Sequence, residues 1–170
     1  MTTDAQENLV DWLRDAHAME QQAESMLQAQ ADRLDNYPTL RARIVQHIDE
    51  TRWQREQLEG CLTRLGSSPS MVKDMAGKMM AFGQAMGGMM VSDEVVKGSM
   101  ASYVFENLEI ATYTVLIAAA EMVGDDQTRN VCQQIIVQEQ AMAAWVLEHL
   151  PSTTDAFLAR SATPGVEASH

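Results

Sequence analysis

Residues 106–120 read ENLEIATYTVLIAAA, a stretch without glycine or proline in which apolar side chains fall on nearly all sides of a helix. A run of this length, rich in alanine, favours a helix over a strand. A helix that is apolar all round is expected to be central or covered on two sides. Glu109 is embedded in this stretch and Glu106 lies one turn earlier, so two carboxylates stand where a core is normally apolar.

Three other stretches repeat apolar residues at steps of three and four, which predicts four long helices in all. Their expected ranges are Asp4–Asn36, Thr39–Leu65, Asp93–Val123 and Asp126–Leu150. Prolines at 38 and 151 are expected to stop the first and the last, because the residue before a proline is disfavoured in a helix. Thr39 is a candidate cap for the second, and Gly66 and Gly124 are expected stops for the second and third.

Short turns make two antiparallel hairpins of these helices, and a Met- and Gly-rich connection over 66–92, with some helix in it, joins the hairpins. One long crossover is the topology of ferritin-like bundles, whereas a simple up-down bundle needs three short loops. We therefore expect an all-α, ferritin-like four-helix bundle over residues 1–160. Residues 161–170 are expected to form a flexible tail.

Length and charge narrow the class of function. At 170 residues the chain suits one domain, and its net charge of −12 repels nucleic-acid phosphates and anionic lipid. No apolar run reaches the roughly 18 residues that span a membrane, and the first residues lack the basic start of a signal peptide. We expect a cytoplasmic protein that has neither nucleic acid nor membrane as a partner.

Carboxylates recur where the helical periodicity predicts a core. Glu20 and Glu139 lie on the apolar stripes of the first and fourth helices, and Glu50 flanks the face of the second that carries His47. An unpaired buried carboxylate is costly, so it must be protonated, paired with a base or bound to a cation. Basic residues number 12 against 24 acidic ones, and none is expected on the core stripes beside these positions. The pattern favours bound iron or manganese, which take oxygen ligands and imidazole; alternatively, some of these glutamates face solvent.

Four strings carry a family resemblance: residues 18–22 (AMEQQ), 47–51 (HIDET), 106–113 (ENLEIATY) and 138–140 (QEQ). They resemble the YciE/YciF family of ferritin-like bacterial stress proteins over nearly the whole chain, and the third string is the most specific. The resemblance implies a ferritin-like bundle, often a homodimer, with a di-iron site. It implies as metal ligands Glu20, His47, Glu50, Glu106, Glu109 and Glu139.

The chain departs from the wider ferritin-like pattern in its histidines. The Glu-x-x-His pairs expected on two helices read ETRW at 50–53 and EQAM at 139–142, so neither has its histidine, and Asn107 stands where the family usually has another. The reversed order occurs instead, in His17-x-x-Glu20 and His47-x-x-Glu50, which also places both groups one turn apart on one face. For His17 we expect a hydrogen-bonding role rather than metal ligation.

Several other residues have ordinary structural explanations. The methionines between 71 and 90 could suggest a Cu(I) site, but methionine also fills irregular gaps, which is the expectation here. Cys61 and Cys132 are expected to be buried thiols, and Tyr113 is expected to pack, although it lies beside Glu109 and could hydrogen-bond a ligand. Motifs of hydrolases, kinases and dehydrogenases are absent from the sequence.

The sequence leaves three functions open. The first is a stress-response protein in which a di-iron or iron/manganese pair reacts with O₂ or peroxide, with oxidase- or peroxidase-like activity. In that case Glu20 and Glu139 would be terminal ligands, Glu50 and Glu109 bridges, and Glu106 a labile or outer carboxylate. The second is a non-catalytic helical dimer with a vestigial or structural metal site, which the missing histidines favour. The third is iron storage in a shell.

Overall fold

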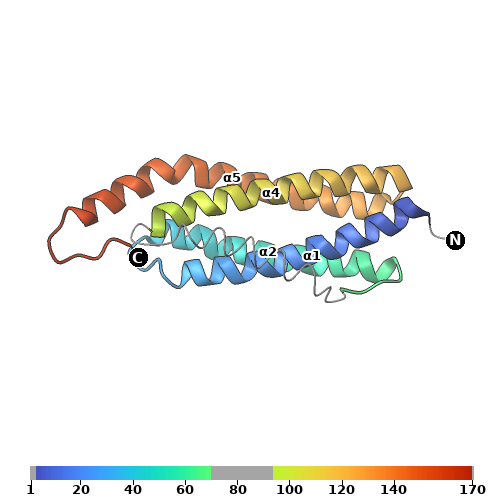
Figure 1. Cartoon of the computed structure of the whole chain (residues 1–170), viewed down its shortest axis with the longest axis horizontal. Coiled ribbons are helices and arrows are strands. Elements are labelled where there is room, and N and C mark those ends of the chain that lie inside the picture. Colours follow the sequence, from blue (N-terminus) through green and yellow to red (C-terminus); the bar gives the residue numbers. More distant parts are fainter. Residues whose placement is uncertain (1–2, 70–93, 170) are drawn as a thin grey trace.

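The computed structural model describes residues 3–69 and 94–169. Within these ranges the chain forms no strand and four helices, which are α1 (Asp4–Ala31), α2 (Pro38–Arg64), α4 (Glu94–Val123) and α5 (Asp126–Ser161). α1 and α2 form one antiparallel hairpin, and α4 and α5 form the other (Figure 1). α1 packs on α2 and α4, and α5 packs on α4 and α2. The expected all-α four-helix bundle is confirmed, while the short helix expected in the connection lies outside the described residues.

The turn between α1 and α2 is placed differently from the expectation. α1 ends at Ala31 rather than at Asn36, and α2 begins at Pro38 itself, with Tyr37 and not Thr39 as its N-cap residue. The backbone N–H at the first position of a helix has no partner within the helix, so proline loses nothing there and its fixed φ suits the start. Pro38 therefore starts the second helix, whereas the first helix has already ended at Ala31.

The expectation that Pro151 ends the last helix is wrong, because α5 continues through it to Ser161. The missing N–H of Pro151 frees the carbonyl of Leu147, and both residues are exposed, so water can satisfy that carbonyl. Beyond the proline, Phe157 packs against buried core residues of the bundle. This packing offsets the cost of an interior proline, about 3 kcal/mol.

The chain after α5 turns back to the end of the bundle. The Tyr37 hydroxyl donates a hydrogen bond to the carbonyl of Ala168, and the Arg160 guanidinium donates to the carbonyl of Glu167 at 2.7 Å. These contacts connect the last described residues to the α1–α2 turn and to α5. The flexibility expected for residues 161–170 stays a prediction.

Two apolar clusters fill the bundle, one on each side of a layer of buried polar side chains. The first contains Leu13 and Ile135, and the second contains Leu27 and Met142. Glu20 lies between Leu13 and Leu27 on α1, and Glu139 lies between Ile135 and Met142 on α5. The polar layer is therefore sealed along the bundle axis by apolar side chains. Cys61 and Cys132 belong to the first cluster as free, buried thiols, as expected.

α4 is covered on one side only by the described part of the chain. Its inner face carries buried residues such as Phe105 and Leu116, but Val104 is 49% and Val115 is 50% exposed. The expectation that this helix is covered on two sides is therefore not met within residues 3–69 and 94–169. No helix in these ranges is both long enough and apolar enough to cross a membrane.

Candidate metal centre

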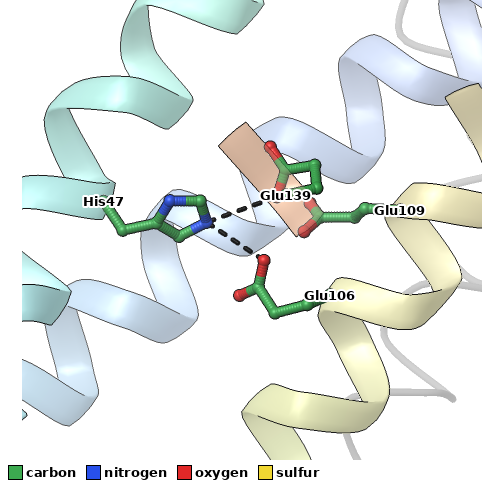
Figure 2. Close-up of side chains that lie close together, drawn as sticks. All are labelled: His47, Glu106, Glu109 and Glu139. Carbon is green, nitrogen blue, oxygen red and sulfur yellow. Dashed lines mark hydrogen bonds and ion pairs between the residues drawn. The ribbon is translucent and has the colours of Figure 1, made fainter. Parts of the chain in front are cut away.

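Three helices bring four of the expected ligands together in the polar layer. His47 comes from α2, Glu106 and Glu109 come from α4, and Glu139 comes from α5. Each of the four is buried, and one ligand atom from each lies within 4.8 Å of the others. Figure 2 shows His47 facing the three carboxylates across the bundle interior. A set of one imidazole nitrogen and three carboxylates is a ligand set that could hold a metal ion.

His47 connects both ends of its ring to carboxylates. Its Nδ1 lies 2.7 Å from Glu50 Oε2, and its Nε2 lies 3.1 Å from Glu106 Oε2 and 3.4 Å from Glu139 Oε2. Burial alone would lower the pKa of His47, but the charge of Glu106 and the hydrogen bonds to all three carboxylates raise it well above its usual range. Without metal, His47 is the cation of the cluster.

The two glutamates of α4 share one environment but differ in their partners. Burial raises the pKa of Glu106 to about 7, against the lowering effect of His47. Burial also raises the pKa of Glu109 well above its usual range, and the charges of Glu139, Glu20 and Glu106 raise it further. Neither oxygen of Glu109 has a hydrogen-bond partner. Glu109 is the carboxylate that the surrounding protein compensates least.

Glu20 lies beside this group and is held by Tyr113. Glu20 is fully buried on α1, and its Oε1 accepts a hydrogen bond from the Tyr113 hydroxyl of α4, whereas its Oε2 has no partner. Burial and the charge of Glu139 raise the pKa of Glu20 well above its usual range, although the Tyr113 hydrogen bond lowers it. The expectation that Tyr113 merely packs is therefore incomplete, because its hydroxyl fixes one carboxylate oxygen in the polar layer.

Glu139 is fixed by Gln54, a residue that the sequence interpretation missed. Gln54 Nε2 donates to Glu139 Oε1 and, at 2.9 Å, to Gln138 Oε1. Burial would raise the pKa of Glu139, but hydrogen bonding and charge from His47 lower it below its usual value. The sequence does contain a signal for this residue, because Gln54 follows His47 by seven residues and therefore lies on the same buried face of the helix.

Glu50 lies at the edge of the cluster rather than among the four central groups. Its carboxylate contacts His47, the guanidinium of Arg43 at 3.3 Å and the amide of Gln46 at 2.8 Å. Burial would raise its pKa, but His47 and Arg43 lower it. Basic residues were not expected on the core stripes, but Arg43, which flanks the stripe of α2, reaches the Glu50 carboxylate and neutralises it. Ligation of a metal by Glu50 stays a prediction.

His17 lies outside the cluster. Its Nε2 is 2.8 Å from Glu59 Oε1, so its polar partner is a half-exposed carboxylate of α2. This agrees with the hydrogen-bonding role expected for His17. Among the described histidines, only His47 contacts the buried carboxylates.

The comparisons with known proteins agree with this architecture. A family model described as a domain of unknown function (DUF892) matches residues 4–159. The chain belongs to the DUF892 family. A protein of Xanthomonas campestris pv. campestris with a solved structure is 38% identical to this chain, with a TM-score of 0.81. The match covers 94% of this chain and 100% of that one.

Two further structures support the same fold for this DUF892 protein. YcfI of Rhodopseudomonas palustris is 26% identical with a TM-score of 0.71, over 85% of this chain and 93% of that one. The Escherichia coli stress protein YciF is 18% identical with a TM-score of 0.75, over 91% of this chain and 99% of that one. With the family match, this likeness in fold confirms the resemblance to the YciE/YciF family.

Proposed function

We propose that this DUF892 protein is a ferritin-like stress-response protein whose buried cluster binds two metal ions, iron or an iron/manganese pair, and reacts with O₂ or peroxide. The observation that carries the proposal is the density of buried carboxylate oxygens without a hydrogen-bond partner. These are Glu20 Oε2, Glu109 Oε1 and Glu109 Oε2, and Glu139 Oε2 has only the His47 ring nitrogen beside it, at 3.4 Å. Three such oxygens in one interior layer demand protons or cations, and His47 is the only cation that lies in this layer in the described residues.

The residues present fit such a pair of ions, with one ion in each half of the cluster. In one half, His47 and Glu106 would supply a nitrogen and an oxygen, and in the other half Glu20 would supply an oxygen. Glu109 and Glu139 would serve both halves, because both belong to the group with His47 and Glu106 and both interact electrostatically with Glu20. Hard ions such as Fe(II) and Mn(II) prefer this oxygen-rich set.

The neighbouring side chains hold the ligands in place. Gln54 occupies one oxygen of Glu139 and leaves the other for a metal ion, and Tyr113 does the same for Glu20. For Glu50 the geometry supports orientation of His47 rather than the bridging role expected from the sequence. Its carboxylate accepts a hydrogen bond from Nδ1 of the ring, which leaves Nε2 toward the cluster.

When bound, a pair of Fe(II) ions would supply the two electrons that reduce one peroxide, with two protons, to two waters. The protein contributes protons and a dry interior. Glu20, Glu106 and Glu109 hold protons because burial raises their pKa values, and binding of metal displaces those protons. The two apolar clusters exclude bulk water from the layer.

The stress-response role rests on the likeness to YciF, whose printed description is a stress protein. The cytoplasm is the proposed compartment because both cysteines are free, as expected in a reducing environment.

The competing function is a non-catalytic helical dimer in which the metal site is structural or vestigial. The pairing of Glu50 with Arg43 favours it, because one expected bridging carboxylate is already neutralised. The two functions differ in what Fe(II)-loaded protein does to peroxide. The catalytic proposal requires peroxide consumption with Fe(III) formation that Glu109→Gln abolishes; an inert loaded protein would establish the structural role.

Metal titration tests the site itself. Apo protein titrated with Mn(II) under argon should bind close to two ions per chain. At a free concentration of 100 times the dissociation constant, binding adds about 2.7 kcal/mol to the free energy of unfolding. Glu121→Ala, at an exposed glutamate on the same helix, is the matched control for Glu109→Ala. Weak, substoichiometric binding that Glu109→Ala leaves unchanged would refute the proposal.

A further inference from the structure

The two cysteines of the chain face each other across the contact between α2 and α5. Gln54 of α2 donates a hydrogen bond to Glu139 of α5, which fixes how these two antiparallel helices are aligned. Cys61 follows Gln54 by seven residues, and Cys132 precedes Glu139 by seven. Seven residues make about two helical turns, so side chains that meet at one level of an antiparallel pair meet again two turns along. The alignment therefore places the two thiols opposite each other.

A second contact between the same helices supports this alignment on the other side of the cysteine pair. The Arg64 guanidinium of α2 donates to the Thr128 hydroxyl of α5 at 2.7 Å. Arg64 lies one turn beyond Cys61, and Thr128 lies one turn before the cysteine of α5. Cys61 and Cys132 are free, are 2% and 0% exposed, and belong to the same apolar cluster. Two reduced thiols are thus enclosed between the two hairpins of the bundle.

The two thiols differ in their surroundings. Burial raises the pKa of the Cys61 thiol, but hydrogen bonding with Thr128 and the charge of Arg64 act to lower it. Burial, together with the charges of Cys61 and Asp125, raises the pKa of Cys132 to about 12. The thiolate is the nucleophilic form of cysteine, so a cysteine beside a cation and a hydroxyl is the more reactive of the two. Cys61 is therefore the attacking thiol of the pair.

A hollow at the end of the bundle reaches the side chains beside Cys61. It has a volume of about 590 Å³, and its lining includes Arg64 and Asp125. Arg64 contacts both this hollow and the Thr128 hydroxyl, so its long, flexible side chain separates the hollow from the thiol. A water molecule takes about 30 Å³, so a molecule as small as hydrogen peroxide fits in the hollow. A shift of the Arg64 side chain would give such an oxidant access to Cys61.

We infer that Cys61 and Cys132 form a peroxide-reactive dithiol, which closes to a disulfide between the two hairpins and is reopened by thiol reductants. The Cys61 sulfur attacks one oxygen of the peroxide, the O–O bond breaks and the first water leaves, so that Cys61 becomes a sulfenic acid. The Cys132 sulfur then attacks the Cys61 sulfur, the S–O bond breaks and the second water leaves. The peroxide gains the two electrons that the thiols lose, and the two thiol protons leave in the two waters.

This activity does not depend on the proposed metal site, because the dithiol itself supplies both electrons. Disulfides that form in a reducing compartment are usually transient and have catalytic or sensing roles, which agrees with a pair that is free in the resting protein. The disulfide would join α2 of one hairpin to α5 of the other, about two turns from the Gln54–Glu139 contact. It would therefore hold the two hairpins together beside the polar layer.

Thiol counting on the metal-free protein tests the inference. The full-length chain is treated with hydrogen peroxide in the presence of chelator, then unfolded, alkylated and weighed by mass spectrometry. We expect the wild type to lose both thiols, to run as a single chain on a non-reducing gel and to recover both thiols with dithiothreitol. Two thiols that survive in the folded protein, under conditions that oxidise them in urea, would overturn the inference. A disulfide between chains would overturn it as well, because the two thiols would then not face each other.

Single alanine variants test the roles of the two thiols. Alanine is used because a buried serine hydroxyl could lack a hydrogen-bond partner. Cys132→Ala should stop at the sulfenic acid of Cys61, which dimedone traps, and Cys61→Ala should lose its thiol about tenfold more slowly. Circular dichroism should show the helix content of the wild type in both variants. Equal rates of thiol loss, or a faster loss in Cys61→Ala, would overturn the assignment of Cys61 as the attacking thiol.

Discussion

Replacing Glu109 with glutamine removes one buried charge and keeps the shape of the side chain. A glutamate that must take up a proton on folding at pH 7 costs about 3 to 4 kcal/mol when its unfolded pKa is near 4.5. Glu109 is 1% exposed, its pKa is raised by burial and three carboxylates, and both of its oxygens lack a partner. Glutamine does not pay this cost, and its amide can donate to Glu139 and Glu20.

We therefore expect apo Glu109→Gln to be more stable than the apo wild type by about 1 to 3 kcal/mol. This is less than the full protonation cost of Glu109, because the glutamine amide is itself buried and its new contacts satisfy it only in part. For a chain of this size that is a rise of roughly 3 to 10 °C in melting temperature. Saturating Mn(II) should reverse the order, since the wild type gains about 2.7 kcal/mol at 100 times its dissociation constant and the variant gains little.

The assay is thermal unfolding of both proteins and of Glu121→Gln, with chelator and with Mn(II). The control should follow the wild type in both conditions, because Glu121 is exposed and lies outside the cluster. A Glu109→Gln protein that is less stable without metal and still binds Mn(II) tightly would make Glu109 a structural hydrogen-bonding residue. That result would refute the assignment of the site.

Three further outcomes follow from the contacts of the cluster. The pKa of Glu106 is raised from 4.5 to about 7, so between pH 4.5 and 7 the folded apo protein binds more protons than the unfolded chain. Its free energy of unfolding should therefore fall as the pH rises from about 5 to 7. A midpoint of urea unfolding that rises over this pH range would contradict the prediction. Gln54→Leu should weaken Mn(II) binding about tenfold by freeing Glu139, as measured by calorimetry; unchanged affinity would remove Gln54 from the site. Tyr113→Phe should lower the free energy of unfolding of the apo protein by about 1 to 3 kcal/mol, because Glu20 loses its hydrogen-bond donor. An equal or higher free energy of unfolding in urea would show that this hydrogen bond adds no stability.

The faces of the helices could be predicted from the sequence because helical periodicity assigns each residue a direction. Glu20, His47, Glu106, Glu109 and Glu139 are all at most 2% exposed, as their places on apolar stripes indicated. Periodicity also marked Gln54 as a polar residue on the buried face of α2. An amide carries no charge and so does not by itself indicate a metal site, although a buried amide needs hydrogen-bond partners as a carboxylate does.

Contacts between helices could not be predicted in the same way. Tyr113 meets Glu20 across 93 residues of sequence, and Gln54 meets Glu139 across 85. Such pairs depend on how far one helix slides along another, and no single helix contains that information. The reach of Arg43 is a similar case, because a long, flexible side chain can cross from a flanking position to a carboxylate one or two turns away.

The missing histidines acquire a physical meaning once these contacts are known. One half of the cluster contains the nitrogen ligand His47, while the other half contains Glu20 with the phenol of Tyr113 and the amide of Gln54. A neutral amide or phenol binds a divalent ion less strongly than imidazole does, so the two halves cannot be equivalent. We therefore expect the first ion to enter beside His47 and to displace its shared protons, and the second to bind more weakly beside Glu20. A Mn(II) titration that shows two identical sites would contradict this order. Two unequal binding steps, of which His47→Gln removes the tighter one, would support it. That result would mean that the absent histidines reduce the affinity of one half without removing the site.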